Sequence, residues 1–296
     1  MFFKLFSRLL LFFTCFLNIC LVQAETYLFS HGFTDNHKQA YSYVKEYKKW
    51  GRIFKNNYYV IDGDLETFNY PDALIKPLVR LNKTSLGQDN EIKTLKNACD
   101  KIDDDVVLVG VSRGAATAIN FVALHDPKNV KALVLEAPFD HVDRVFDHAW
   151  YTRLMSKILY SGTNRRLQNL FAKISHYDLD GQQPINLVDK IRKDLPIIFI
   201  CSESDNVIKY EASENLYKKL RSLGHKHVYL LKFKPGRHAR LLWSKNGEIY
   251  QNVVHAFYKK YGLLHNDLFA RRGEPYFKKC QPEIDDLKTY FIGWDR

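Results

Sequence analysis

Residues 106–116 have the sequence VVLVGVSRGAA, an apolar run followed by a Gly-x-Ser-x-Gly pattern. The run is typical of a buried strand, and the alanines after the pattern favour a helix. A turn tight enough to join strand to helix strains the backbone of Ser112, and side chains in place of Gly110 and Gly114 would collide with their neighbours. The stretch therefore predicts a serine hydroxyl held out at a sheet edge, beside helical N–H groups that favour negative charge. The alternative is that Ser112 only caps the helix.

Around this stretch, short apolar runs alternate with helical patterns, which indicates a parallel sheet wrapped by helices. We expect strands at 27–30, 58–61, 106–111, 131–136, 197–201 and 228–233. Apolar residues at helical spacing predict helices within 40–50 and 92–102. The predicted fold class is α/β, a three-layer α/β/α sandwich with about six mainly parallel strands.

The alternation stops between residues 140 and 194, where 148–161 and 165–175 have helical patterns without a convincing strand between them. This stretch is predicted to be a helical insertion and, from its place in the chain, a candidate lid. Its basic residues also fit an ordinary solvated helical face. The predicted parts of the mature chain are two pieces of core, the insertion and a C-terminal tail, at 25–139, 195–270, 140–194 and 271–296.

The first 24 residues differ from the rest of the chain. Lys4 and Arg8 supply a short positive region, and an apolar run follows. The segment ends with VQA at 22–24, which has small residues at its first and last positions. This layout is typical of a secretory signal peptide, so we expect a secreted or periplasmic protein that starts near Glu25. The alternative is an uncleaved membrane anchor, because the apolar run lengthens when the preceding phenylalanines are counted.

The formal net charge of +11 falls to +9 without this segment, which has two basic residues and no acidic one. A basic surface fits peripheral contact with an anionic membrane, but the even spread of the charges favours solubility alone. No nucleic-acid motif accompanies the charge, so no nucleic-acid partner is expected. The cysteines beyond the segment, Cys99, Cys201 and Cys280, lack the spacing of a zinc site, a redox pair or a disulfide framework.

A serine hydroxyl is a poor nucleophile until an imidazole takes its proton, so the pattern around Ser112 requires a histidine. His238 follows the last predicted strand in the turn sequence KPGRH, where a base could reach back over the sheet edge. His225 and His227 precede that strand and would lie at its opposite end. The alternative interpretation of His238 is a solvent-exposed loop histidine.

The histidine in turn needs a carboxylate that fixes its tautomer and stabilises the imidazolium. Asp205 follows the fifth predicted strand in the sequence SESDNV, and an Asx-turn that only shapes the loop is its alternative role. Asp140, after the fourth predicted strand, is the second candidate acid. Ser112, Asp205 and His238 occur in the chain order serine, acid, histidine.

The oxyanion of an acyl transfer needs preorganised N–H donors. One is predicted to be the backbone N–H of Arg113, the residue after the serine. The other is predicted in the loop SHGFT after the first strand, where Gly32 permits a sharp turn and Phe33 supplies the N–H. His31 is expected to shape this loop rather than to act as a base.

With these residues identified, the chain resembles the α/β-hydrolase superfamily from about residue 27 to about residue 260. The counterparts of the oxyanion loop, the nucleophile elbow, the acid and the base are 31–33, 110–114, Asp205 and His238. EAPFD at 136–140 and SESDNV at 202–207 are similar to segments of prolyl-oligopeptidase-like and serine-aminopeptidase-like members. The first predicted strand begins close to the predicted cleavage point, whereas many members carry further strands before it.

The resemblance implies a serine hydrolase that cleaves a carboxylic ester, thioester or amide through an acyl-serine intermediate, and the predicted signal segment implies that it is exported. Its substrate would be a small-molecule or peptide acyl compound, and no metal or organic cofactor is required. A serine peptidase of the prolyl-oligopeptidase or aminopeptidase type is one alternative. A catalytically inactive binding protein of the same fold is the other, and the presence of all three catalytic residue types argues against it.

Overall fold

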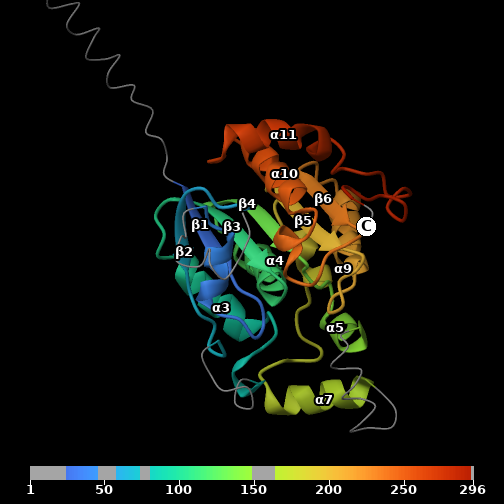
Figure 1. Cartoon of the computed structure of the whole chain (residues 1–296). Helices are drawn as coiled ribbons and strands as arrows, with labels where there is room; N and C mark the ends of the chain where they lie inside the picture. Colours follow the sequence, from blue (N-terminus) through green and yellow to red (C-terminus); the bar gives the residue numbers. More distant parts are fainter. Residues whose placement is uncertain (1–24, 46–57, 74–80, 149–163, 295–296) are drawn as a thin grey trace, which may run out of the picture.

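The computed structural model describes residues 25–45, 58–73, 81–148 and 164–294 (Figure 1). In these residues one parallel sheet has the strand order β2-β1-β3-β4-β5-β6. The strands are β1 (Glu25–Ser30), β2 (Asp64–Thr67), β3 (Asp105–Val111), β4 (Val130–Glu136), β5 (Ile197–Ser202) and β6 (Val228–Phe233). The structure confirms all the predicted strands except the second, with small shifts at their ends. Because the strands are parallel, their carboxyl ends share one edge of the sheet.

The predicted strand at 58–61 is wrong. Val60 and Ile61 are buried, but their N–H groups donate to the carbonyl of Tyr43 instead of joining the sheet. The second strand is β2, which pairs with β1 at the margin of the sheet and has alternating exposed and half-buried residues. An edge strand of this kind needs little apolar burial, so its sequence DLET carries no apolar run.

Helices cover both faces of the sheet and complete the predicted three-layer sandwich (Figure 1). On one face lie η1, α10 and α11, and on the other α3, α4 and α9. Successive strand residues contribute to the two cores in turn, as Leu28 and Phe29 do. The helical segments of the described residues are η1 (His37–Tyr43), η2 (Leu81–Lys83), α3 (Asp89–Cys99), α4 (Arg113–His125), α5 (Val142–His148), α7 (Asn164–Ile174), α8 (Pro184–Leu187), η3 (Val188–Lys190), α9 (Tyr210–Ser222), η4 (Leu241–Trp243), α10 (Gly247–Lys260) and α11 (Asp267–Phe277).

Between β4 and β5 the described residues form α5, α7, α8 and η3 and contain no strand. The helical pattern at 165–175 corresponds to α7, whereas 148–161 lies outside the described residues except for His148. Phe139, Phe146 and Tyr177 form a small apolar cluster with residues of α4 and α9. The segment between β4 and β5 is therefore anchored to the core beside the start of α4.

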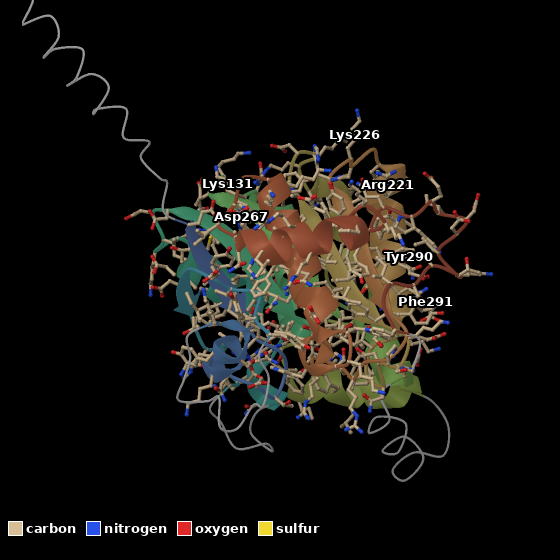
Figure 2. All side chains as sticks on the ribbon, turned by 45° about the horizontal axis from the view of Figure 1, so that its top comes forward. Lys131, Arg221, Lys226, Asp267, Tyr290 and Phe291 are labelled. Atoms are coloured by element: carbon tan, nitrogen blue, oxygen red, sulfur yellow. The ribbon has the colours of Figure 1, made fainter. Side chains whose placement is uncertain are left out.

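The C-terminal segment runs along β6, where Tyr290 and Phe291 mark it in Figure 2. The Tyr290 hydroxyl donates to the carbonyl of Leu230, and the N–H of Ile292 donates to that of Lys232. These bonds satisfy carbonyls of a strand at the margin of the sheet.

The predicted signal segment, residues 1–24, lies outside the described residues. Among the residues that the structure does describe, we find no helix with the length and apolarity needed to cross a membrane. Cys99, Cys201 and Cys280 are buried and unbridged.

Candidate active site

The strand β3 passes directly into α4 through Ser112, whose backbone has φ 55° and ψ −121°. This positive φ is costly for a residue with a side chain and persists only where the surroundings impose it. The surroundings here are tight: a Cβ on Gly110 would lie 2.7 Å from the Cα of Ala115, and one on Gly114 would lie 2.0 Å from the carbonyl oxygen of Ser30. The two glycines thus let α4 approach β3 and β1 closely enough to form the elbow.

Three side chains from distant parts of the chain meet at this elbow. The Oγ of Ser112 lies 2.9 Å from Nε2 of His238, and Nδ1 of His238 lies 2.8 Å from Oδ2 of Asp205. A carboxylate only accepts, so Nδ1 carries the imidazole proton and Nε2 is left to accept from the serine hydroxyl. The series can move a proton from the serine oxygen to the imidazole while the carboxylate stabilises the resulting cation.

The alternative roles of these residues can be compared with their contacts. Ser112 stands at the N-cap of α4, but its hydroxyl makes no capping hydrogen bond. Asp205 does form the turn considered for it, since its Oδ1 accepts from the N–H groups of Val207 and Ile208, and its Oδ2 remains for His238. The Asx-turn and the contact with the imidazole therefore coexist, one oxygen each, and the turn fixes the direction of the carboxylate.

The loop after β1 reaches the elbow from the other side. A methyl group on Gly32 would lie 3.7 Å from the Cβ of Ser112, which is ordinary van der Waals contact. Neither the N–H of Phe33 nor that of Arg113 donates to another described residue. Both remain predicted oxyanion donors. A side chain at residue 32 would therefore fit without a steric clash, whereas one at residue 114 would not.

The other candidate acid and the other candidate bases from the sequence have different partners or lie at the opposite sheet edge. Asp140 forms an ion pair of 2.8 Å with Arg144 and accepts from Asn215, so it does not serve His238. His227 contacts the hydroxyl of Tyr261. His225 is buried next to the start of β6, at the opposite sheet edge, and burial lowers its pKa.

His31 shapes the loop after β1. Its Nε2 accepts from the N–H of Tyr70, so Nδ1 carries the proton and donates to the carbonyl of Gly32 at 2.9 Å. Both ring nitrogens are thereby engaged within the loop and its neighbour.

Two residues that the sequence analysis did not select also contact the site. The carboxylate of Glu136, at the end of β4, accepts from the hydroxyls of Tyr43 and Tyr250 and from the N–H of Leu241, which follows His238 by three residues. Burial raises the pKa of Glu136. His148 of α5 contacts the carbonyl of Asp205 through Nε2 at 2.9 Å. A charged residue ending an apolar strand was the available signal for Glu136; His148 offered none.

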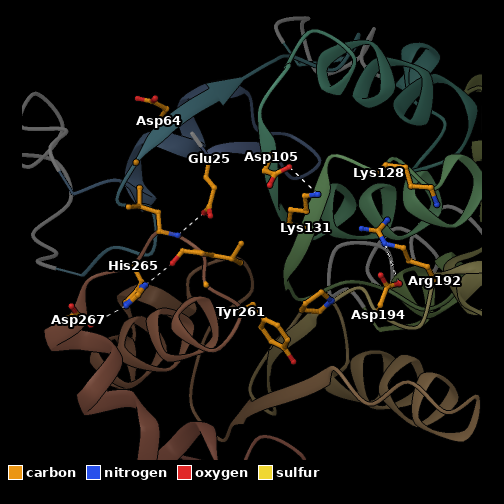
Figure 3. A pocket seen from close by; sticks show the side chains of 15 residues that line it. Glu25, Asp64, Asp105, Lys128, Lys131, Arg192, Asp194, Tyr261, His265 and Asp267 are labelled. Carbon is orange, nitrogen blue, oxygen red and sulfur yellow. Dashed lines mark hydrogen bonds and ion pairs between the residues drawn. The ribbon is translucent and has the colours of Figure 1, made fainter. Parts of the chain in front are cut away.

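The described residues also line an open pocket of about 1140 Å³ at the opposite edge of the sheet (Figure 3). Glu25, Asp105 and Lys131 stand there at the amino ends of their strands, and Lys131 pairs with Asp105. This pocket is separated from Ser112 by the length of β3. In the part of the chain that the structure describes, no group of histidine, cysteine or carboxylate side chains is arranged to hold a metal ion.

Comparison with known proteins gives a family match over the central part of the chain. The model of the prolyl oligopeptidase family matches residues 100–262, more than half of the sequence. A curated protein of Bacillus subtilis (strain 168), the uncharacterized protein YqkD, is 30% identical over 150 residues, which are 50% of this chain and 46% of YqkD. The chain thus matches about half the length of that relative.

Solved structures are similar in fold. The esterase Pf2001 of Pyrococcus furiosus superposes with a TM-score of 0.52 and 18% identity, over 81% of this chain and 84% of the esterase. The acylaminoacyl peptidase of Pyrococcus horikoshii superposes with a TM-score of 0.55 and 14% identity, over 80% of this chain and 37% of the peptidase. At such identities the likeness concerns the fold, and it confirms the predicted α/β-hydrolase architecture.

Proposed function

We propose that this chain, which belongs to the prolyl oligopeptidase family, hydrolyses acyl compounds with Ser112 as its nucleophile. The family match and the structural neighbours identify a serine hydrolase of α/β-hydrolase fold, the enzyme class that the sequence indicated. One observation carries the proposed mechanism: a serine at a positive-φ elbow, an imidazole and a carboxylate are joined in series by hydrogen bonds of 2.9 and 2.8 Å.

In the first step the Ser112 oxygen attacks the substrate carbonyl carbon while Nε2 of His238 takes the hydroxyl proton. Asp205 accepts from Nδ1–H and stabilises the imidazolium. The backbone N–H groups of Phe33 and Arg113 hold the oxyanion of the tetrahedral intermediate. Its collapse expels an alcohol, thiol or amine, which receives the proton from His238, and an acyl-serine remains.

Hydrolysis of the acyl-serine reuses the same groups. Water gives a proton to Nε2 of His238 as its oxygen attacks the acyl carbon, and a second oxyanion forms between the same two N–H donors. The carboxylic acid then leaves, and the proton on His238 returns to the Ser112 oxygen. Both halves of the proposed reaction thus use the Ser112–His238–Asp205 series and the same two N–H donors.

The substrate is proposed to be a small-molecule or peptide acyl compound, as an ester, thioester or amide. The likeness to an esterase supports the first class of leaving group, and the family match together with the acylaminoacyl peptidase supports the peptide alternative. Turnover of a p-nitrophenyl acyl ester and of an aminoacyl p-nitroanilide by the purified protein separates them. The ratio of the two kcat/KM values decides the class, and turnover of neither favours a binding protein.

Export is proposed from the sequence of residues 1–24 alone. Expression in a bacterium followed by N-terminal sequencing of the secreted or periplasmic protein should give a chain that starts at Glu25. A chain that keeps the segment and sediments with membranes would instead support the anchor. Release of anchored protein by salt alone would support peripheral contact with an anionic surface.

Residues 140–194 are proposed as a lid on the core formed by 25–139 and 195–270. The contact between His148 of α5 and the carbonyl of Asp205 supports this, because it brings the segment against the residue that orients the imidazole. Deletion of the described helix α7, Asn164–Ile174, should change KM for long-chain esters more than for acetate esters. Equal effects on both would count against a lid.

A fluorophosphonate probe tests the nucleophile directly. We expect one covalent adduct on the wild-type protein and none on Ser112→Ala. The matched control is Ser222→Ala, an exposed serine at the end of α9 and hence near the opposite sheet edge, which should label like the wild type. Labelling that survives Ser112→Ala, or absence of labelling in folded wild-type protein, would refute the mechanism.

A further inference from the structure

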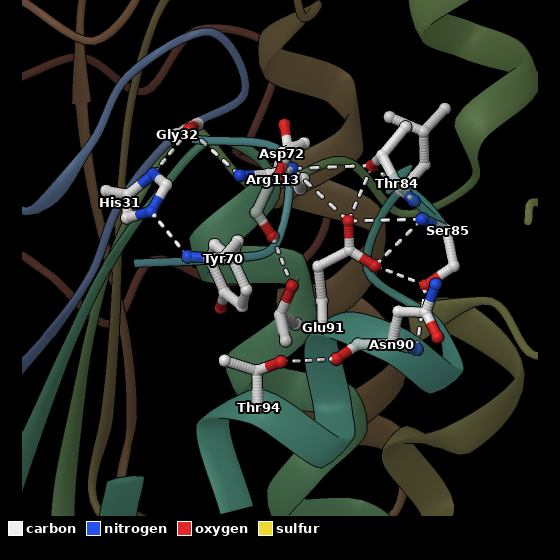
Figure 4. Close-up of polar contacts among 12 residues, drawn as sticks. His31, Gly32, Tyr70, Asp72, Thr84, Ser85, Asn90, Glu91, Thr94 and Arg113 are labelled. Carbon is white, nitrogen blue, oxygen red and sulfur yellow. Dashed lines mark hydrogen bonds and ion pairs between the residues drawn. The ribbon is translucent and has the colours of Figure 1, made fainter. Parts of the chain in front are cut away.

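The side chain of Arg113 is buried, although its residue directly follows the nucleophile. Its exposed fraction is 1%, and a guanidinium at such a depth needs partners to offset lost hydration. Nη1 pairs with Asp72 at 2.7 Å and with Glu91 at 3.2 Å, and donates to Thr84 at 3.3 Å (Figure 4). Both carboxylates are as buried as the arginine, so the cluster is held inside the protein rather than at its surface.

Glu91 is itself fixed by further donors. The hydroxyl of Thr84 donates to it at 2.5 Å, and the N–H and hydroxyl of Ser85 donate to it as well. Asp72 lies in the segment that follows β2, and Glu91 lies in the first turn of α3. The guanidinium therefore joins the elbow to two separate parts of the chain.

The other end of the guanidinium reaches the oxyanion loop. Nη2 of Arg113 donates to the carbonyl of Gly32 at 3.3 Å, and the guanidinium lies 5.4 Å from the ring centre of Phe33 and 4.5 Å from that of Tyr70. These positions are within the usual range of cation–π contact. The arginine side chain thus contacts Gly32 and Phe33, the two residues that one peptide bond joins.

That peptide bond joins the carbonyl of Gly32 to the N–H of Phe33. Because a trans peptide is planar, holding its carbonyl oxygen fixes the direction of its N–H, which points the opposite way. The carbonyl is held by Arg113 Nη2 and by His31 Nδ1, and the N–H of Gly32 donates to Gln39 at 2.9 Å. The N–H of Phe33 is left in a set direction, and none of the residues that the structure describes accepts from it.

We propose that the side chain of Arg113, held by Asp72 and Glu91, positions the oxyanion hole by orienting the Gly32–Phe33 peptide. One residue then supplies one oxyanion donor through its backbone and sets the direction of the other through its side chain. The guanidinium is a positioning group, because it acts through the peptide and not on the substrate. The inference rests on the proposed function, in which those two N–H groups bind the oxyanion.

The test uses variants that keep the backbone N–H of residue 113. In Arg113→Lys the charge remains for Asp72 or Glu91, but an ammonium lacks the planar fork that reaches Gly32 at the same time. We expect kcat for a p-nitrophenyl ester to fall by about 10- to 100-fold with little change in KM, since displacing a donor weakens transition-state binding. Glu91→Gln loosens the same cluster and should give a smaller fall of the same kind.

A second substrate separates positioning from general damage to the fold. In a thionoester the carbonyl oxygen is replaced by sulfur, a weak hydrogen-bond acceptor, so its hydrolysis depends little on the oxyanion donors. Arg113→Lys should therefore lower kcat/KM for the oxygen ester and leave that for the thionoester nearly unchanged. The ratio of the two values should fall by about the same 10- to 100-fold.

The matched control is Lys232→Met, which removes another buried cation. Lys232 pairs with Glu214 at 2.6 Å and lies on β6, with three strands between it and the oxyanion loop. Its loss should lower the thermal midpoint and leave the ratio of oxygen ester to thionoester at the wild-type value. A comparable fall of the ratio in this variant would overturn the inference.

The two proposals fail in different ways. If wild-type protein neither labels with the fluorophosphonate nor turns over the ester, the proposed function is wrong. If it does both and Arg113→Lys keeps the wild-type ratio, or loses both substrates equally, only the positioning role is wrong. Should Arg113→Lys fail to fold, the ratio in Glu91→Gln decides, and an unchanged ratio there overturns the inference.

Discussion

Replacing Gly114 by alanine tests whether close packing at the elbow sets the geometry of the site. The added Cβ would lie 2.0 Å from the carbonyl oxygen of Ser30 and 2.7 Å from that of His31. The optimal separation of non-bonded heavy atoms is about 3.5 Å, so the end of β1 or the start of α4 must move by roughly 1 to 1.5 Å. Both obstacles are backbone atoms, and no side-chain rotation relieves the contact.

A shift of this size separates the oxyanion loop from Ser112. Misplacing reacting groups by about 1 Å costs about 100-fold in rate, and overpacking a core costs about 1 to 3 kcal/mol of stability. We therefore expect Gly114→Ala to lower kcat/KM for an ester by about 100-fold or more, and to lower the free energy of unfolding by about 1 to 3 kcal/mol.

Gly32→Ala is the control, because its Cβ would meet no atom closer than 3.7 Å. Ester hydrolysis gives kcat/KM, and urea unfolding gives the free energy. In the control we expect a free energy of unfolding within about 1 kcal/mol of the wild type and activity within about threefold. Wild-type kcat/KM in Gly114→Ala, or an equally large loss in Gly32→Ala, would show that steric closeness at the elbow does not set the site.

Three further predictions follow from buried titratable groups. Burial raises the pKa of Glu136 above 4.5, so the free energy of unfolding should decline as the pH rises from about 4.5, and urea titrations of Glu136→Gln should lack this decline. Burial lowers the pKa of His255 from 6.5 to about 4, so stability should fall by up to roughly 3 kcal/mol as the pH drops through that interval, and an equal fall in His255→Leu contradicts this. Burial raises the pKa of the Cys99 thiol to about 11 and that of Cys280 to about 12. The native protein should therefore react far more slowly with iodoacetamide than an ordinary thiol of pKa about 8.5, with reactivity appearing as the chain unfolds.

The sequence revealed those strands whose two faces are both covered. A strand such as β3 or β5 is buried along nearly its whole length and so appears as a continuous apolar run. The edge strand β2 is half exposed and has no such run, while 58–61 is apolar because it packs into the core without pairing in the sheet. An apolar run therefore indicates burial rather than pairing in the sheet. The strand β6 lies at the other margin of the sheet, yet it was predicted because it is buried along its whole length.

The meeting of the three side chains was predictable because parallel strands bring their carboxyl ends to one edge. The cluster around Arg113 was not, since Asp72 is 41 residues away in the chain and does not lie at the end of a predicted strand. The spacing of charged residues along the sequence does not indicate which of them form buried ion pairs. Such pairs are identified from the three-dimensional structure, whereas an elbow or a turn is predicted from residues that are close in sequence.

The loops of the site are each fixed by a different polar contact, and the apolar core alone would not fix them. Loops at strand ends expose backbone N–H and carbonyl groups that need partners once they are shielded from water. Arg113 supplies a donor to the oxyanion loop, and Glu136 supplies an acceptor to the N–H of Leu241 in the loop of His238. Asp205 holds its own turn through one oxygen and the imidazole through the other. Apolar contacts are non-directional, whereas these hydrogen bonds set orientation, and acyl transfer depends on orientation to within a fraction of an ångström.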